Sequence, residues 1–407
     1  MQARPRSTVG SILAASGLCA VLALSLGACA RAPGASPRGA TRRTTGAADL
    51  GGAHAVRRDA TSSSGLVYGA TGAGMFSQAV SGDPELVYVP NSGEPGAHGS
   101  HFSASPDRNS VTVIDPRSFK VVSHFPAGVL PQHVTPSWDL RTLWVDASGS
   151  NQLIPIDPRT ARPGTPIGVE APYNLYFTPD GRAALVMAER LNRIDVRDPH
   201  TMALRRSVTV PCDGVNHADF SADGRYLVAS CEFSGQLLKL DTRTLAVLGV
   251  LDLGAYSMPQ DVRLGPDGRT FFVASLNGGG LITVDGATFH RTGFIPTAAG
   301  AHGIYPSRDG RLLYVSNRDA GSVSVVDPNV RRSVATWPVP HGSPDMGGVS
   351  ADGTQLWLSG RDDDEVYVLS TETGHLLARI PVGANPHGLA FFPQPGRYSL
   401  GHTGNYR

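Results

Sequence analysis

Short apolar runs alternate with polar turns along most of the chain. Runs such as "RYLVAS", "LLYVSN" and "QLWLSG" are typical of half-buried β-strands. Turns such as "TPDG", "SADG" and "SRDG" place Asp-Gly where a tight hairpin requires a positive φ. In "DPRS" and "DPNV", Asp and Pro occupy the first two positions of a type I turn. The pattern predicts an all-β chain of short antiparallel strands.

This pattern repeats with a period of about 40 to 45 residues. A polar residue opens a strand about seven positions before each Asp-Gly turn. Its occurrences are Gln132, Tyr173, Asn216, Gln260, His302, Asp345 and His387. A second series ends the "VxVxD" strands, at Asp115, Asp157, Asp198, Asp241, Asp285, Asp327 and Ser370. Both series count seven units, and the period indicates four strands per unit, so we predict a seven-bladed β-propeller.

The two ends of the repeat are complementary. The stretch "ELVYVPNSG" at 85–93 and the strand at 111–115 precede any strand-opening residue, whereas "PHGLAFF" at 386–392 has no strands after it. We therefore expect the N-terminal part to supply three strands of one blade and the C-terminal part its innermost strand, which closes the ring. Residues 397–407 have three possible places: the second-strand position, one face of the propeller, or the channel mouth.

The motifs "LYVSN", "VVDP" and "PHG" and the "SPDG"-like turns resemble those of the YVTN-repeat (YncE-like) seven-bladed β-propellers over residues 85–396. The second and third blades depart from the motif, with "LWVDAS" and "ALVMAE". The resemblance implies the fold and an extracytoplasmic location, and it does not imply an activity. Propeller lactonases and haem-binding propellers of nitrite-reductase type share the architecture, but this is an analogy of fold alone.

The first 29 residues have the composition of an export signal. Arg4 and Arg6 precede an apolar stretch at 12–28, which ends in "LGAC" and is short for a membrane span. This ending resembles the bacterial lipobox, which implies that Cys29 becomes a lipidated N-terminus. A secreted protein cut nearby and an uncleaved anchor are the alternatives. We expect the protein to be extracytoplasmic and held to the cell membrane by lipid.

Residues 30–64 are rich in Ala, Gly, Ser, Thr and Arg and hold almost no large apolar residue. Such a segment cannot bury enough surface to offset its chain entropy, so we predict a flexible tether, with the propeller over 65–407. The charged fraction is 17% and the formal net charge is +1, which gives no reason to expect a nucleic-acid partner. We expect a monomer that binds a protein or a small molecule.

In a propeller, the first residues of the innermost strands meet at one mouth of the central channel. The next positions are also polar in several units, with His133, Asn174, His217 and Asp261. Imidazole and carboxylate groups together bind divalent transition metals or copper, so His217, His302 and His387 are candidate metal ligands. The alternative is a polar channel wall that is satisfied by water.

Two polar segments outside this ring carry competing interpretations. The insert at 93–107 holds His98 and His101, which either join a metal site or lie in a solvated loop. The run "RDDDE" at 361–365 is predicted to be a solvated turn between second and third strands, with Ca²⁺ binding as the alternative.

Two of the four cysteines, Cys19 and Cys29, lie in the signal segment. The other two, Cys212 and Cys231, flank the hairpin "VNHADFSADGRYLVAS", whose pairing brings them together. We predict a disulfide in an oxidising compartment. A pair of thiolates that binds Cu(I) with His217 is the alternative.

These observations support two hypotheses about function. The first is a membrane-tethered binding module that acts through the channel face of the propeller. The second is a metal- or cofactor-binding propeller with lactonase-like or redox activity, which the His and Asp residues of the mouth favour. The sequence has no G-x-S-x-G elbow, phosphate loop or CxxCH motif, so we favour the first hypothesis.

Overall fold

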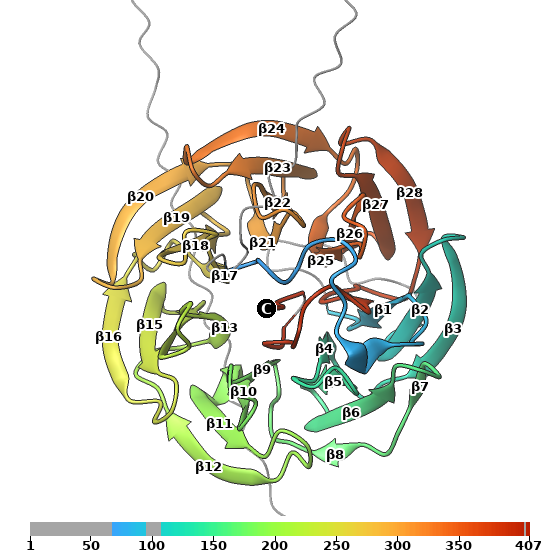
Figure 1. Ribbon diagram of the computed structural model, residues 1–407, viewed down its shortest axis with the longest axis horizontal. Helices are drawn as coiled ribbons and strands as arrows, with labels where there is room; N and C mark the ends of the chain where they lie inside the picture. Colours follow the sequence, from blue (N-terminus) through green and yellow to red (C-terminus); the bar gives the residue numbers. More distant parts are fainter. Residues whose placement is uncertain (1–66, 95–106, 403) are drawn as a thin grey trace, which may run out of the picture. The chain divides into compact units, whose positions relative to one another are not determined.

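The computed structural model describes residues 67–94, 107–402 and 404–407. The predicted signal segment, Cys29, the tether, His98 and His101 lie outside these ranges. Seven antiparallel sheets follow one another around a central axis (Figure 1). The predicted fold, a seven-bladed β-propeller, is therefore confirmed. The described ranges also contain two short 3-10 turns, η1 (Gln78–Val80) and η2 (Glu189–Leu191). None of the helices within them is long and apolar enough to span a membrane.

Each blade has an innermost, a second, a third and an outer strand. The innermost strands are β4 (Pro131–Pro136), β9 (Asn174–Phe177), β13 (Val215–Phe220), β17 (Pro259–Leu264), β21 (Ala301–Pro306), β25 (Pro344–Val349) and β29 (Ala390–Phe392). The second strands are β5 (Leu143–Ala147), β10 (Ala184–Ala188), β14 (Tyr226–Cys231), β18 (Thr270–Ser275), β22 (Leu313–Asn317), β26 (Gln355–Gly360) and β1 (Leu86–Asn91).

The third and outer strands complete the sheets. The third strands are β6 (Gln152–Asp157), β11 (Arg193–Arg197), β15 (Gln236–Asp241), β19 (Gly280–Asp285), β23 (Ser322–Asp327), β27 (Glu365–Ser370) and β2 (Ser110–Asp115). The outer strands are β12 (Leu204–Thr209), β16 (Val247–Asp252), β20 (His290–Pro296), β24 (Arg332–Pro338), β28 (Leu376–Pro381) and β3 (Lys120–Pro126), with β7 (Arg162–Pro163) and β8 (Ile167–Gly168) sharing this position in one blade.

The ring closes as the sequence predicts. Strand β29 pairs antiparallel with β1, with Val87 opposite Phe391. Phe391 is 2% exposed and packs with Val87, Leu389 and Trp357 in one core cluster. Because residues from the two ends of the propeller share a sheet and a core, neither end presents a free strand edge there.

Five innermost strands break register with their neighbour after the first residue. Between β13 and β14, Val215 pairs with Cys231 and the next pair is Ala218 with Ala229. The same break occurs in β4, β17, β21 and β25. The two residues inside each break are released from the regular alternation of a strand, as in a β-bulge. This explains why consecutive polar residues, and not alternate ones, reach the hub.

The C-terminal tail, residues 397–402 and 404–407 of the described chain, does not take the second-strand position that the sequence left open. Strand β1 holds that position in the blade that closes the ring. The tail enters the central channel (Figure 1). The backbone N–H of His402 donates to Leu175 in β9 at 2.9 Å. Nη2 of Arg407 donates to both carboxylate oxygens of Asp219, at 2.9 Å to Oδ1 and 3.0 Å to Oδ2. The tail therefore contacts innermost strands from Leu175 near the start of β9 to Asp219 near the end of β13.

The predicted disulfide between Cys212 and Cys231 is present. Cys231 ends β14 and lies opposite Val215 at the start of β13. The bond therefore joins the segment that leads into an innermost strand to the end of the next strand, close to the hub. With both sulfurs in this bond, the alternative Cu(I) site with His217 does not form.

Candidate ligand site at the propeller hub

Six residues of the predicted ring lie at or next to the start of an innermost strand, and His387 lies three residues before β29. Six of the seven are at most 4% exposed, and Tyr173 is partly exposed. Five of the ring residues line a cavity of about 170 Å³: Gln132, Tyr173, Gln260, His302 and His387. One water occupies about 30 Å³ in the liquid, so this cavity has room for a small solute.

Five further residues line the same cavity and carry formal charge. One is Glu94, whose Oε2 accepts a hydrogen bond from Nε2 of Gln132 at 3.2 Å. The other four are Glu189, Glu232, Arg318 and Arg361, and each is the first residue after a second strand. They therefore form a third repeated series, with the same spacing as the two series in the sequence, which sequence analysis missed. The sequence feature that could have revealed this series is the charged residue that follows each of "LVMA", "VASC", "YVSN" and "WLSG".

The charges are separated across the mouth. Glu189 and Glu232 follow β10 and β14, which belong to neighbouring blades, and Arg318 and Arg361 follow β22 and β26, which belong to another neighbouring pair. The position between the two pairs holds Leu276. These four residues therefore give the cavity one acidic side and one basic side, and Glu94 adds a further carboxylate next to Gln132.

On the acidic side, the two carboxylates share one amide. Asn216 donates through Nδ2 to Glu189 at 3.1 Å and to Glu232 at 2.6 Å. Burial and the neighbouring Glu232 raise the pKa of Glu189 to about 8. Burial also raises the pKa of Glu232. Because two buried carboxylates repel each other, the pair holds a proton near neutral pH and presents both a donor and acceptors to the cavity.

On the basic side, Asp345 organises the nearest groups. Arg318 donates to its Oδ1 through Nε at 3.0 Å and Nη2 at 2.5 Å. His302 and His387 direct Nδ1 to the same carboxylate, at 3.2 and 2.6 Å. Burial alone would raise the pKa of Asp345, but Arg318 and the two imidazoles hold it well below its usual range. Asp345 therefore compensates the charge of Arg318.

Arg361 forms no ion pair with a carboxylate of the described residues. It is 5% exposed, and its Nε and Nη1 atoms have no hydrogen-bond acceptor among those residues. Burial lowers the pKa of Arg361, yet a guanidinium stays protonated in proteins. The prediction that "RDDDE" is a solvated turn is therefore wrong for Arg361, although residues 361–364 do form the turn between β26 and β27. The first residue of the run faces the hub because it follows a second strand.

The predicted metal ligands are divided between two groups. His302 and His387 both contact Asp345, as described above. His217 instead brings a ring nitrogen close to one nitrogen of His133 and one of His402 in the tail. Burial lowers the pKa of His217 to about 3 and that of His387 to about 4. Both imidazoles are therefore neutral at neutral pH.

The fold and this hub define a β-propeller with a polar pocket on its axis. The chain belongs to the YNCE-like β-propeller family, whose model matches residues 96–395. No curated protein matches the chain in sequence.

Several solved structures share the fold. The periplasmic gluconolactonase PpgL of Pseudomonas aeruginosa is 19% identical, with a TM-score of 0.63, over 76% of this chain and 99% of that one. A putative 6-phosphogluconolactonase from Bacteroides uniformis is 18% identical, with a TM-score of 0.60, over 75% and 99%. Hydrazine synthase of Kuenenia stuttgartiensis is 22% identical, with a TM-score of 0.57, over 65% and 90%. At these identities the likeness shows the fold alone.

Proposed function

We propose that this protein is an extracytoplasmic binding module whose hub pocket takes a small solute that carries a carboxylate. The observation that carries the proposal is the buried guanidinium of Arg361, which lines the cavity and has two nitrogens without an acceptor in the part of the chain that the structure describes. An unpaired buried charge is costly, and a carboxylate is the group that the planar guanidinium fork binds best.

The acidic side of the cavity indicates which groups the solute carries at the end away from its carboxylate. Glu189 and Glu232 supply carboxylate oxygens, and Gln132 has an Oε1 atom without a donor. Hydroxyl or ammonium groups satisfy such acceptors. The preferred ligand is therefore a small hydroxy acid, sugar acid or amino acid that spans the mouth between the two sides.

The test is a binding measurement with matched solutes on the full-length protein. D-gluconate, L-serine and L-glutamate are the carboxylate probes, and sorbitol is the control because it has the gluconate carbon chain without the carboxylate. We expect at least one carboxylate probe to bind, measured by calorimetry, and sorbitol not to bind. Arg361→Gln should weaken the binding by about 10- to 100-fold, since a hydrogen bond to a charged group contributes about 1.5–3 kcal/mol.

Arg311→Gln is the matched control, because the Arg311 side chain is 77% exposed on a turn. It should leave the affinity unchanged. Equal affinity of the Arg361→Gln and wild-type proteins would contradict the proposal. Failure of all three carboxylates to bind at millimolar concentration would contradict it as well.

Hydrolysis of a lactone is the second candidate function. The observation that favours it is His387, whose Nδ1 is 2.6 Å from Asp345 while its Nε2 is 3.4 Å from the Tyr173 hydroxyl in the cavity wall. This is the arrangement of an oriented general base. It ranks second because a general base works best with a pKa near the operating pH, and that of His387 is lowered to about 4. Turnover of δ-gluconolactone that His387→Gln abolishes would reverse the ranking.

We also propose that the propeller is attached to the membrane through a lipidated Cys29 and the tether at 30–64, which the lipobox-like "LGAC" supports. A pair of acyl chains makes such anchoring stable, at about 0.8 kcal/mol per buried CH₂. Cells fed radiolabelled palmitate should label the protein and retain it in the membrane fraction. Cys29→Ala should abolish the label, and a label that persists in this variant would refute lipidation at this residue.

A further inference from the structure

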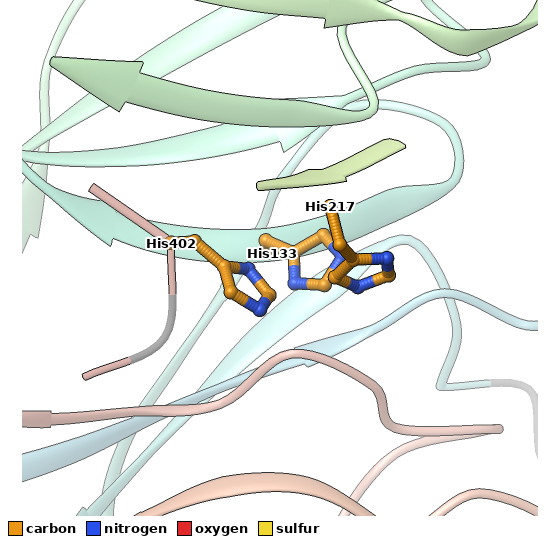
Figure 2. Close-up of side chains that lie close together, drawn as sticks. All are labelled: His133, His217 and His402. Carbon is orange, nitrogen blue, oxygen red and sulfur yellow. The ribbon is translucent and has the colours of Figure 1, made fainter. Parts of the chain in front are cut away.

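Three imidazoles lie close together at the centre of the propeller (Figure 2). His133 comes from β4, His217 from β13 and His402 from the tail, and one nitrogen of each lies within 4.8 Å of the other two. All three side chains are at most 1% exposed. Residues from three distant parts of the sequence therefore bring nitrogen ligands to one point.

Three ring nitrogens of this cluster are buried without hydrogen-bond partners among the described residues. They are Nδ1 and Nε2 of His133 and Nε2 of His217. Such an atom costs about 1–3 kcal/mol when it stays unsatisfied. A buried imidazole normally directs at least one nitrogen to a protein partner, so the arrangement at His133 requires another explanation.

Amide oxygens hold the Nδ1 atoms of His217 and His402. Nδ1 of His217 is 3.0 Å from Oδ1 of Asn216, and Nδ1 of His402 is 2.9 Å from Oδ1 of Asn174. An amide oxygen only accepts, so each Nδ1 carries the proton and each Nε2 carries the lone pair. Metal-binding histidines are oriented in this way by a partner on the second ring nitrogen.

We propose that His133, His217 and His402 form a binding site for one divalent transition metal ion of the Zn²⁺ or Cu²⁺ type. Imidazoles that bind one such ion at about 2.1 Å have ring centroids about 5 Å apart at the tetrahedral angle. The observed centroid separations are 4.8 Å between His217 and His402, 5.0 Å between His133 and His402, and 5.9 Å between His133 and His217. Small side-chain rotations therefore bring all three nitrogens to one ion.

The surroundings suit a cation. Oδ1 of Asp261 is 3.7 Å from Nε2 of His402 and accepts no hydrogen bond. Asp261 is buried and its Oδ2 is held by Arg263 at 3.2 Å and by the backbone N–H of Ile304 at 3.0 Å. A fixed carboxylate close to Nε2 of His402 lowers the energy of a divalent ion bound to that nitrogen.

The site depends on the tail, because the tail supplies His402. The tail is docked independently by Arg407 and Asn405, which both bond Asp219. A ligand that binds only the docked state stabilises that state. Metal binding therefore holds the tail in the channel. This inference uses none of the charged residues of the mouth cavity, so it stands apart from the proposed carboxylate ligand.

The test uses untagged full-length protein, stripped of metal with a chelator, and the metal ions alone as probes. We expect one equivalent of Co²⁺ to produce ligand-field absorption bands, and one equivalent of Zn²⁺ to abolish them. His402→Gln should lower the Zn²⁺ affinity about 100-fold or more, since even the loss of a residue that orients a ligand costs 10- to 100-fold. His290→Gln is the control, because His290 is exposed on β20, and it should bind like the wild type.

Two further measurements do not depend on the variants. Zn²⁺ should slow the hydrogen exchange of the backbone amides of Gly401 and His402, and Cu²⁺ should give an electron paramagnetic resonance spectrum with splittings from several imidazole nitrogens. No stoichiometric binding at micromolar metal would overturn the proposal and indicate that water alone satisfies the three histidines. Binding that His402→Gln leaves intact would also overturn it.

Discussion

Asp345→Asn is expected to lower the free energy of unfolding by about 3–5 kcal/mol. The carboxylate is fully buried and holds Arg318, His302 and His387. An amide of the same size removes the negative charge and leaves the buried guanidinium of Arg318 uncompensated. Urea unfolding of the two proteins, followed by tryptophan fluorescence, measures the difference.

A double-mutant comparison separates charge from packing. Adding Arg318→Gln to Asp345→Asn should restore part of the lost stability, because both members of the buried pair are then neutral. Asp319→Asn, at an exposed neighbouring position, should change the stability by about 0.5 kcal/mol or less. Equal effects of Asp345→Asn and Asp319→Asn would show that the carboxylate does not organise the basic side of the hub.

Phe391→Ala should destabilise the propeller by about 3–5 kcal/mol, because it deletes a large buried side chain at the closure of the ring. The ring of Phe391 is 6.0 Å from that of Trp357, measured between centroids, and Trp357 is fully buried in the neighbouring blade. Truncation opens a cavity between the first and last parts of the propeller. Chemical unfolding should show the loss as a lower midpoint in denaturant.

The matched control is Phe294→Ala in the outer strand β20. Phe294 is 39% exposed, so its removal should cost about 1 kcal/mol. If Phe391→Ala were no more destabilising than this control, the packing between β29 and β26 would not be what holds the two ends together.

The hub shows how far the repeat could be followed from the sequence. The ring that begins with Gln132 was predictable because its members recur with one period, and five of the seven open an apolar strand at a fixed distance from an Asp-Gly turn. The charged series of Glu189, Glu232, Arg318 and Arg361 has the same period, yet each member stands in a polar turn, where charge is normally solvated. Its burial depends on the ends of second strands from different blades meeting around one cavity, which a local pattern does not record.

The histidine cluster was harder to predict. His133 and His217 occupy equivalent positions in two blades, and the register breaks in β4 and β13 turn them toward the axis. His402 belongs to no repeat. Its place follows from the docking of the tail on Asp219 through Arg407 and Asn405, which are contacts between residues separated by more than 180 positions.

The sequence by itself determined the number of blades, the strand order, the closure of the ring and the disulfide. Each of these follows from local apolar alternation, turn chemistry and a repeated spacing, because neighbouring strands of a blade are also neighbours in the chain. Only the tertiary structure decided which polar groups share the hub, which charges remain uncompensated there, and that the tail lies in the channel. Those outcomes depend on distances across the axis, where residues from different blades meet and burial, rather than sequence neighbourhood, sets the energy of each group.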